Sequence, residues 1–334
     1  MSKIILPVKH SVFEAYTLGN QVLRNYNGLG KIVNCDLLAT GIHDVYRLKT
    51  TMAQYIIKVY ACNKRKSEIL EEAKLINHLS SKRFPTPALI KNSKEKQMYH
   101  THAPEGIRYV LLFNYINGGQ PIFDFSSSSQ YGKLIAKLHA YTDHWKISSP
   151  KKTALDIECL IDKPLYHIRQ ALSSREKNKI LTEITEACRE IIQQLPITTP
   201  SYGICHGDIV SNGIMMRKNR LGILDFEWFG QGWRVYDISQ FLWSIQHGTL
   251  PAHQNSLPSA VLLWESFLNA YKTHRVLSLQ EEKAIPAFLI VRSLWMLGLQ
   301  FAFSNTLGKL DATYNLENIW DIMCENRDML LKNL

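Results

Sequence analysis

The 334-residue sequence contains no pair of cysteines at the spacing that zinc or redox sites use. Its six scattered cysteines therefore predict buried free thiols in a reducing compartment. The first ten residues hold no apolar run long enough for a secretory signal. The most hydrophobic segment, 286–303, is interrupted by Arg292 and Gln300, which predicts a buried helix rather than a membrane span. The sequence also has no internal repeats. Without a secretory signal or a membrane span, we expect a cytoplasmic protein that has no membrane partner.

Basic residues outnumber acidic ones, but unevenly. The formal net charge is +10, and residues 1–119 carry 17 basic and 8 acidic side chains, against 7 and 9 in residues 237–334. The basic part lacks the interleaved aromatic residues of a nucleic-acid groove, so we predict no nucleic-acid partner. A solvated lysine-rich surface is the favoured interpretation, and attraction of a polyanionic nucleotide is the alternative.

The length predicts two lobes rather than one core. Helical spacing predicts helices over 13–26 and 67–79, and β-branched and aromatic runs predict strands over 31–38, 45–48, 54–60, 88–90 and 109–116. Together they describe a small α+β lobe over residues 1–116. The segment from Asn117 to Pro121, with two adjacent glycines, is the strongest break in the chain. It makes residues 117–334 a second, mostly helical lobe.

The second lobe contains seven segments with helical periodicity, at 129–142, 163–172, 176–194, 237–245, 260–274, 280–303 and 316–331. Asp237 stands where a helix N-cap belongs, and a structural cap is its predicted role. His139 lies in the first of these helices and is predicted to be a packed core histidine.

Two acidic segments carry the chemistry of the second lobe. An apolar approach from Tyr202 leads into His206-Gly207-Asp208, and a hydrophobic strand ends at Asp225, which is followed by Phe226 and Glu227. Two acids at the ends of such elements can serve as the base and the metal ligand of phosphoryl transfer.

These segments resemble the catalytic and metal-binding segments of the aminoglycoside phosphotransferase/choline kinase-like superfamily, and the resemblance covers about residues 37–302. It implies a protein-kinase-like two-lobed fold of the α+β class, with ATP or GTP as phosphate donor and Mg²⁺ as cofactor. It also implies that Asp208 is the base or orienting acid for a substrate hydroxyl, that His206 orients the loop, and that Asp225 ligates Mg²⁺.

One residue departs from the superfamily's pattern. The fifth residue after Asp208 is usually an asparagine that helps to hold Mg²⁺, but here it is Gly213, and the asparagine precedes it as Asn212. In one interpretation Gly213 adopts dihedral angles forbidden to other residues, so that Asn212 still reaches the metal. In the other, Asp225 holds the ion with water and phosphate ligands, which Mg²⁺ tolerates.

The first lobe supplies the expected nucleotide-binding residues. Lys58 lies on an apolar strand, and a carboxylate on the following helix would hold it; the superfamily's spacing favours Glu72, with Glu71 as the alternative. The segment Thr40 to Val45 would lie over the phosphates, with Gly41 as its one glycine. By position, the carbonyl of Asn114 and the amide of Ile116 are expected to pair with the base.

The acceptor is predicted to be a small molecule: an antibiotic such as an aminoglycoside, or an amino-alcohol or hydroxy-amino-acid metabolite. Glu227 is a candidate for a water-mediated metal contact or for substrate contact, and the alternative is a solvated residue at a strand end. Arg292 is a candidate for contact with an acceptor carboxylate or for a supporting position. The displaced asparagine keeps open a weakened, nucleotide-binding pseudokinase, and the fold keeps open a protein serine/threonine kinase. The pattern favours no particular oligomeric state.

Overall fold

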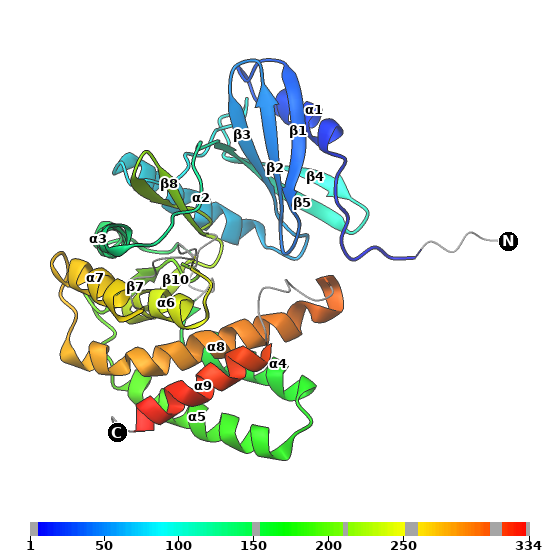
Figure 1. Cartoon of the computed structure of the whole chain (residues 1–334). Helices are drawn as coiled ribbons and strands as arrows, with labels where there is room; N and C mark the ends of the chain where they lie inside the picture. Colours follow the sequence, from blue (N-terminus) through cyan, green and yellow to red (C-terminus); the bar gives the residue numbers. More distant parts are fainter. Residues whose placement is uncertain (1–5, 149–153, 210–212, 251–259, 308–315, 332–334) are drawn as a thin grey trace. The chain divides into compact units, whose positions relative to one another are not determined.

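A computed structural model describes residues 6–148, 154–209, 213–250, 260–307 and 316–331. The chain divides into two compact units, one comprising the chain up to Asn117 and the other beginning at Gly118 and containing almost all of the rest (Figure 1). Each unit is described by itself.

The first unit is an antiparallel sheet with two helices. Its strand order is β1-β2-β3-β5-β4, and the strands are β1 (Ile32–Ala39), β2 (Asp44–Thr50), β3 (Gln54–Val59), β4 (Met98–Ala103) and β5 (Gly106–Asn114). Helix α1 (Ala15–Asn25) packs on one face, where Leu18 and Val22 join Leu48 and Ile57 in a buried cluster. The other helix, α2 (Lys66–Ser81), follows β3 and ends ahead of Pro85, because prolines cannot continue a helix.

The expected strands of this unit need two corrections. The predicted strand at 88–90 is reduced to a single bridge between Leu89 and Phe113. The real edge strand is β4, whose side chains include Thr101 at an inward, buried position. A polar residue on the buried face removes the alternation by which such a strand is recognised.

The second unit is mostly helical, with a small sheet of order β6-β10-β7 and a hairpin of β8 and β9. Its strands are β6 (Ala154–Leu155), β7 (Tyr202–Cys205), β8 (Ile214–Arg217), β9 (Arg220–Ile223) and β10 (Gly230–Trp233). Its helices are α3 (Phe125–Tyr141), α4 (Lys163–Ala171), preceded by a π-helical turn at Glu158–Asp162, α5 (Arg175–Gln193), α6 (Arg234–Gln246), α7 (Ala260–Lys272), α8 (Leu279–Leu307) and α9 (Leu316–Leu331).

Helix α8 forms the centre of the main core of this unit. Its residues 287–291 are fully buried against side chains from α4, α5, α6 and α9 (Figure 1). The stretch Leu279–Phe303 is long and apolar enough to cross a membrane, but 83% of its most apolar window is buried inside the protein. It is therefore a core helix, as its interrupting polar residues predict.

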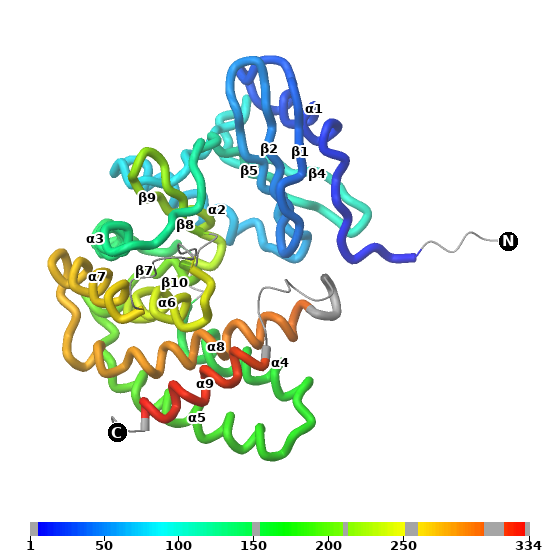
Figure 2. The backbone as a smooth tube through the Cα atoms, in the orientation of Figure 1, coloured from blue at the N-terminus to red at the C-terminus, as the bar shows by residue number. Residues whose placement is uncertain are grey.

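Helices α3 and α7 lie side by side on another part of the unit (Figure 2). Helix α3 begins with a capping box, in which Asp124 accepts from the amide of Ser127 and the Ser127 hydroxyl bonds back to Asp124. At Gly132 a Cβ would stand 2.1 Å from the carbonyl oxygen of Phe267, so the absence of a side chain permits this close helix contact.

All six cysteines are free thiols. Cys35, Cys188 and Cys205 are buried as expected, whereas Cys62 is exposed and the other two are half-buried.

Candidate active site

The catalytic segment of the second unit leaves strand β7 in a turn that requires glycine. Gly207 has a φ of +86°, and a Cβ there would lie 2.2 Å from the carbonyl oxygen of Trp228. A side chain is excluded both by the backbone conformation and by this contact. The turn therefore brings residues 206–209 directly against the segment that follows Asp225.

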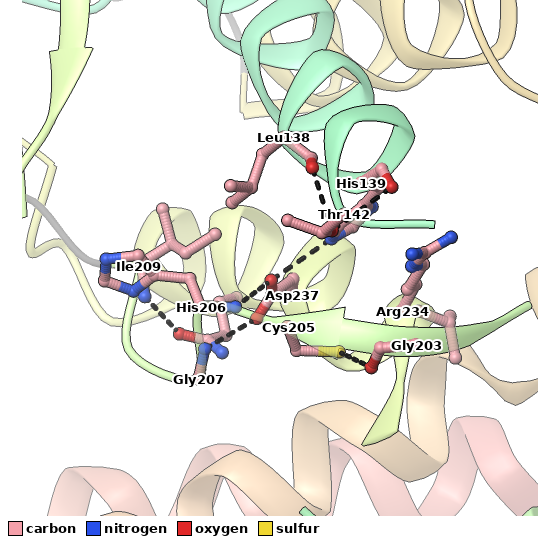
Figure 3. Close-up of polar contacts among 12 residues, drawn as sticks. Leu138, His139, Thr142, Gly203, Cys205, His206, Gly207, Ile209, Arg234 and Asp237 are labelled. Carbon is pink, nitrogen blue, oxygen red and sulfur yellow. Dashed lines mark hydrogen bonds and ion pairs between the residues drawn. The ribbon is translucent and has the colours of Figure 1, made fainter. Parts of the chain in front are cut away.

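The carboxylate of Asp237, on helix α6, lies beside this turn and holds it (Figure 3). Its carboxylate accepts hydrogen bonds from the amides of His206 at 2.6 Å and Gly207 at 3.0 Å, and contacts the ring of His139 at 3.2 Å. The predicted helix cap is thus wrong: Trp233 is the N-cap residue of α6, and Asp237 lies one turn inside the helix. Its position near a helix start was visible in the sequence, but its partners 30 and 31 residues away were not.

Burial and hydrogen bonding set the charges in this support. Burial lowers the pKa of His139 to about 4, so the ring is neutral at physiological pH. Burial alone would raise the pKa of Asp237, but the hydrogen bonds from His139 and Gly207 bring it below its ordinary value. A neutral histidine therefore supports an ionised, fully buried aspartate, and His139 is a packed core histidine as expected.

Two further side chains fix the end of the loop. The amide of Ile209 donates to Gln240 of α6 at 2.7 Å, and the hydroxyl of Tyr131 on α3 donates to the Ile209 carbonyl at 3.3 Å. Gln240 and Tyr131 are both buried. Asp237 binds the two residues before Asp208, and these contacts bind the residue after it, so the loop backbone is held on both sides of Asp208.

The ring of His206 joins the two acidic segments. One ring nitrogen, Nε2, lies 2.8 Å from the carbonyl oxygen of Leu224, and the other, Nδ1, accepts from the amide of Asp208 at 3.3 Å. The ring also packs against Phe226 with centroids 4.6 Å apart. Since both nitrogens serve backbone groups, the side chain orients Asp208 relative to the residue preceding Asp225.

Asp225 lies just beyond strand β9 in a left-handed backbone conformation, with a φ of +56°. Such a conformation is uncommon for residues other than glycine and clusters at functional sites. Its side chain is exposed, whereas Glu227 is buried with 7% of its surface accessible. Glu227 is therefore not a solvated residue at a strand end, one of the two interpretations open from sequence.

Asp208 forms an ion pair that the sequence did not predict. Its Oδ1 lies 2.5 Å from Nη2 of Arg292 on helix α8, whose side chain is 1% exposed while that of Asp208 is 28% exposed. The guanidinium also stacks between Trp243 and Trp295, at 5.4 and 4.6 Å from the ring centroids. Arg292 is thus engaged inside the protein with the loop acid, and the predicted contact with an acceptor carboxylate gives way to a supporting position.

Gly213 shows how the displaced asparagine bears on this site. The interpretation in which Gly213 bends the backbone so that Asn212 still reaches the metal stays a prediction, because the φ of Gly213 depends on the residue before it. A Cβ at this position would make ordinary contacts, at 3.4 Å from the carbonyl oxygen of Asp208 and 3.8 Å from that of Leu224. A side chain at 213 would therefore start between the two acidic segments. Asn212 lies outside the described residues.

The donor set suits a hard cation. Within the described ranges, no three His, Cys, Asp or Glu side chains are grouped to hold a metal by themselves. Mg²⁺ needs no such cage, because it is commonly bound through one or two carboxylates, with waters and substrate phosphates completing its shell. The exposed carboxylate of Asp225 fits that requirement.

In the first unit, Lys58 on β3 pairs with a carboxylate of α2. Its Nζ lies 3.6 Å from Oε1 of Glu72 and 4.9 Å from the centroid of the Tyr60 ring, and both charged side chains are buried. Glu71, the alternative partner, pairs instead with Lys74 at 2.7 Å. The ion pair is internal to this unit and fixes the ammonium at the end of β3.

The other expected nucleotide-binding groups are accessible in this unit. A Cβ at Gly41 would meet nothing within 4 Å, so the loop before β2 has open space beside it. The strand β5 ends at Asn114, whose amide donates to the carbonyl of Ala88. Among the described residues the amide of Ile116 has no hydrogen-bond acceptor, which leaves it available to a ligand.

Comparison with solved structures defines the class of protein. An amicoumacin kinase superposes with a TM-score of 0.76 at 15% identity, covering 96% of this chain and 94% of that one. A microcompartment-associated aminopropanol kinase superposes with a TM-score of 0.74 at 18% identity, covering 95% and 98%. The fold is therefore kinase-like, with an antiparallel-sheet N-terminal part and a helical C-terminal part.

The family follows from the sequence. The model of the phosphotransferase enzyme family matches residues 37–257, and the chain belongs to that family. An uncharacterized protein of Synechocystis sp. is 28% identical over 296 residues, covering 86% of this chain and 78% of that protein. The resemblance drawn from the two acidic segments is confirmed, and the protein is a small-molecule phosphotransferase that acts on an alcohol group.

Proposed function

We propose that the protein transfers the γ-phosphate of ATP or GTP, with Mg²⁺, to a hydroxyl of a small antibiotic, amino alcohol or hydroxy-amino acid. The observation that carries this proposal is the half-exposed carboxylate of Asp208. It stands on a loop fixed at His206, Gly207 and Ile209, and the buried side chain of Arg292 lies against it. A fixed carboxylate that remains accessible is what an acceptor hydroxyl needs for orientation and loss of its proton.

The expected site residues would each have a separate role in one nucleophilic substitution at the γ-phosphorus. The acceptor oxygen forms a bond to the γ-phosphorus, the bond from that phosphorus to the β-bridging oxygen breaks, and the hydroxyl proton passes to Asp208. Lys58, held by Glu72, would neutralise phosphate oxygens, and the Asn114 carbonyl and Ile116 amide would bind the base. Bound Mg²⁺ would be held by Asp225 and would supply charge neutralisation on the phosphates.

The acceptor class is tested by labelled phosphate transfer from ATP and from GTP to a panel of alcohols. The panel holds aminoglycosides, amicoumacin, aminopropanol, homoserine and hydroxylysine, with a serine/threonine peptide mixture to test the protein-kinase alternative. Transfer to one small acceptor that disappears in Asp208→Ala is the expected result. Transfer to the peptides alone would replace the proposal with the protein-kinase function.

A second candidate, a nucleotide-binding protein with weakened catalysis, is favoured by the Asn212-Gly213 order. The double substitution Asn212→Gly with Gly213→Asn restores the superfamily's order, and the space at Gly213 admits a side chain. If the metal site is impaired, this variant transfers phosphate faster or at lower Mg²⁺ concentration than the wild type. Equal rates and equal Mg²⁺ dependence would contradict an impaired site.

The proposal includes a cytoplasmic location, where ATP, GTP and the expected acceptors are available. Cell fractionation with an antibody to the chain tests this part, and recovery in the membrane fraction would contradict it.

A further inference from the structure

Arg108 of strand β5 is fully buried in the first unit and binds groups from three other segments. Its guanidinium donates to the carbonyls of Tyr60 at 2.9 Å, Val59 at 3.2 Å and Ser11 at 2.6 Å, and its Nη2 lies 2.8 Å from a carboxylate oxygen of Asp44. A buried charge is tolerated only when it is paired and hydrogen-bonded. Arg108 therefore ties the end of β3, just beyond Lys58, to the start of β2.

Asp44 closes the loop that contains Gly41. Its Oδ1 accepts from the Thr40 hydroxyl at 2.7 Å and contacts Nε2 of His10 at 3.1 Å, while its other oxygen faces Arg108. Thr40 and Asp44 are the two ends of the loop, so this carboxylate fixes its span. Asp44 is fully buried, which means that it does not itself reach a ligand.

The segment His10–Phe13, here called the N-terminal strap, lies against the same charges. Ser11 donates its amide and its hydroxyl to Glu105 at 3.1 and 2.8 Å, and the Tyr46 hydroxyl donates to the Phe13 carbonyl at 2.9 Å. The Phe13 ring also covers the Arg108 guanidinium, with the centroid 5.4 Å from its central carbon. The strap thus contributes three of the contacts that enclose the Arg108–Asp44 pair.

The strap supplies hydrogen bonds to the buried carboxylates around Arg108. Arg108 faces two carboxylates, those of Asp44 and Glu105, and their side chains are at most 4% exposed. His10 adds a further donor to Asp44, and Ser11 adds two to Glu105. Hydrogen bonds, with those from Ser11 foremost, hold the pKa of Glu105 below its ordinary value although burial opposes this.

We propose that the N-terminal strap, Arg108 and Asp44 form a positioning device for the nucleotide phosphates. The device sets the span of the loop from Thr40 to Asp44 and the end of the strand that carries Lys58. This inference rests on the proposed function of that loop and of Lys58. Because the loop and Lys58 are the groups expected to contact the phosphates, the effect of the device is confined to ligands that carry phosphates.

Binding of two ligands to the full-length protein tests the device. The ligands are AMP-PNP with Mg²⁺ and adenosine, measured by calorimetry. The variants are Thr40→Val, which removes the hydroxyl that closes the loop but keeps the side-chain shape, and His10→Ala, which removes the strap's contact with Asp44. The matched control is His102→Ala, an exposed histidine on β4 of the same unit. The thermal unfolding of each variant is also measured, because a general loss of stability would weaken the binding of both ligands alike.

The expected result is a loss of AMP-PNP affinity of about three- to tenfold in Thr40→Val and in His10→Ala, as for one hydrogen bond each. Adenosine affinity stays unchanged in both, and the control matches the wild type for both ligands. Unchanged AMP-PNP affinity, or an equal loss for the two ligands, would overturn the inference. A wild type that binds neither ligand would instead overturn the proposed function, and this inference with it.

Discussion

Each compact unit contains a buried arginine that pairs with an aspartate, and the two aspartates differ in exposure. In the first unit, Arg108 and Asp44 are both fully buried. In the second, Arg292 is buried but 28% of the Asp208 side chain is accessible. The enclosed carboxylate fixes a backbone loop, whereas the half-exposed carboxylate is held in place with one side open, as the proposed function requires of it.

The largest expected difference between the two pairs is in stability. Asp44→Asn removes the nearer of the two carboxylates that face Arg108 and leaves only Glu105, at 3.6 Å. We expect a cost of about 3 kcal/mol, the lower end of the range for breaking a buried pair. In Asp208→Asn the amide oxygen of the new side chain can still accept a hydrogen bond from Arg292, and the site is open to water. We therefore expect the free energy of unfolding to fall by only about 1 kcal/mol. Urea unfolding of both variants measures this difference. Equal losses would show that exposure does not separate the two pairs.

The second difference concerns pH, because a neutral histidine supports the loop that carries Asp208, whereas an arginine supports Asp44. The pKa of His139 is lowered by burial to about 4, against 6.5 for an unperturbed histidine. Between these values the unfolded chain binds a proton that the folded chain does not, so stability falls as the pH falls. At pH 5 the loss relative to pH 7 is about 2 kcal/mol from this group. Unfolding free energies at the two pH values check it.

The control for this pH effect is His139→Gln, which has no titrating ring. Its stability between pH 7 and pH 5 should fall by less than that of the wild type, by about the same 2 kcal/mol. Parallel pH curves for the two proteins would mean that His139 does not stay neutral in the folded state.

The smallest expected effect comes from replacing the arginine of the half-exposed pair. Arg292→Lys keeps the charge but loses the planar group that stacks between Trp243 and Trp295. We expect the rate of phosphate transfer to fall about tenfold while the affinity for AMP-PNP stays the same. Arg108→Lys is the matched variant, and there nucleotide affinity and stability should fall together. An Arg292→Lys protein with weakened nucleotide binding would contradict the separation of roles.

Local patterns in the sequence predict most of the fold. The helices of the second unit follow from their periodicity, whereas the choice of Glu72 as the partner of Lys58 came from the resemblance to the superfamily. Strand β4 was missed because Thr101 faces inward and interrupts the apolar alternation. Features that depend on residues close together in the sequence were predicted, and features that depend on packing between distant segments were not.

Two residues around the site depend on distant contacts that the sequence alone does not show. Asp237 binds amides about 30 residues earlier in the chain, and Arg292 reaches an acid 84 residues away. Contacts between residues so far apart in the chain produce no local pattern in the sequence. A charged residue interrupting an apolar helix was the one signal for Arg292, and its meaning required the partner to be known.

The central claim is that Asp208 acts in the chemistry and Asp44 only in support. The direct measurement is the rate of labelled phosphate transfer to the best acceptor, at saturating nucleotide, for Asp208→Asn and Asp44→Asn. We predict a loss of about 10³-fold for Asp208→Asn with AMP-PNP binding retained. For Asp44→Asn, assayed where it is folded, the loss at saturating nucleotide should be less than about tenfold. Comparable rates for Asp208→Asn and the wild type would contradict the account.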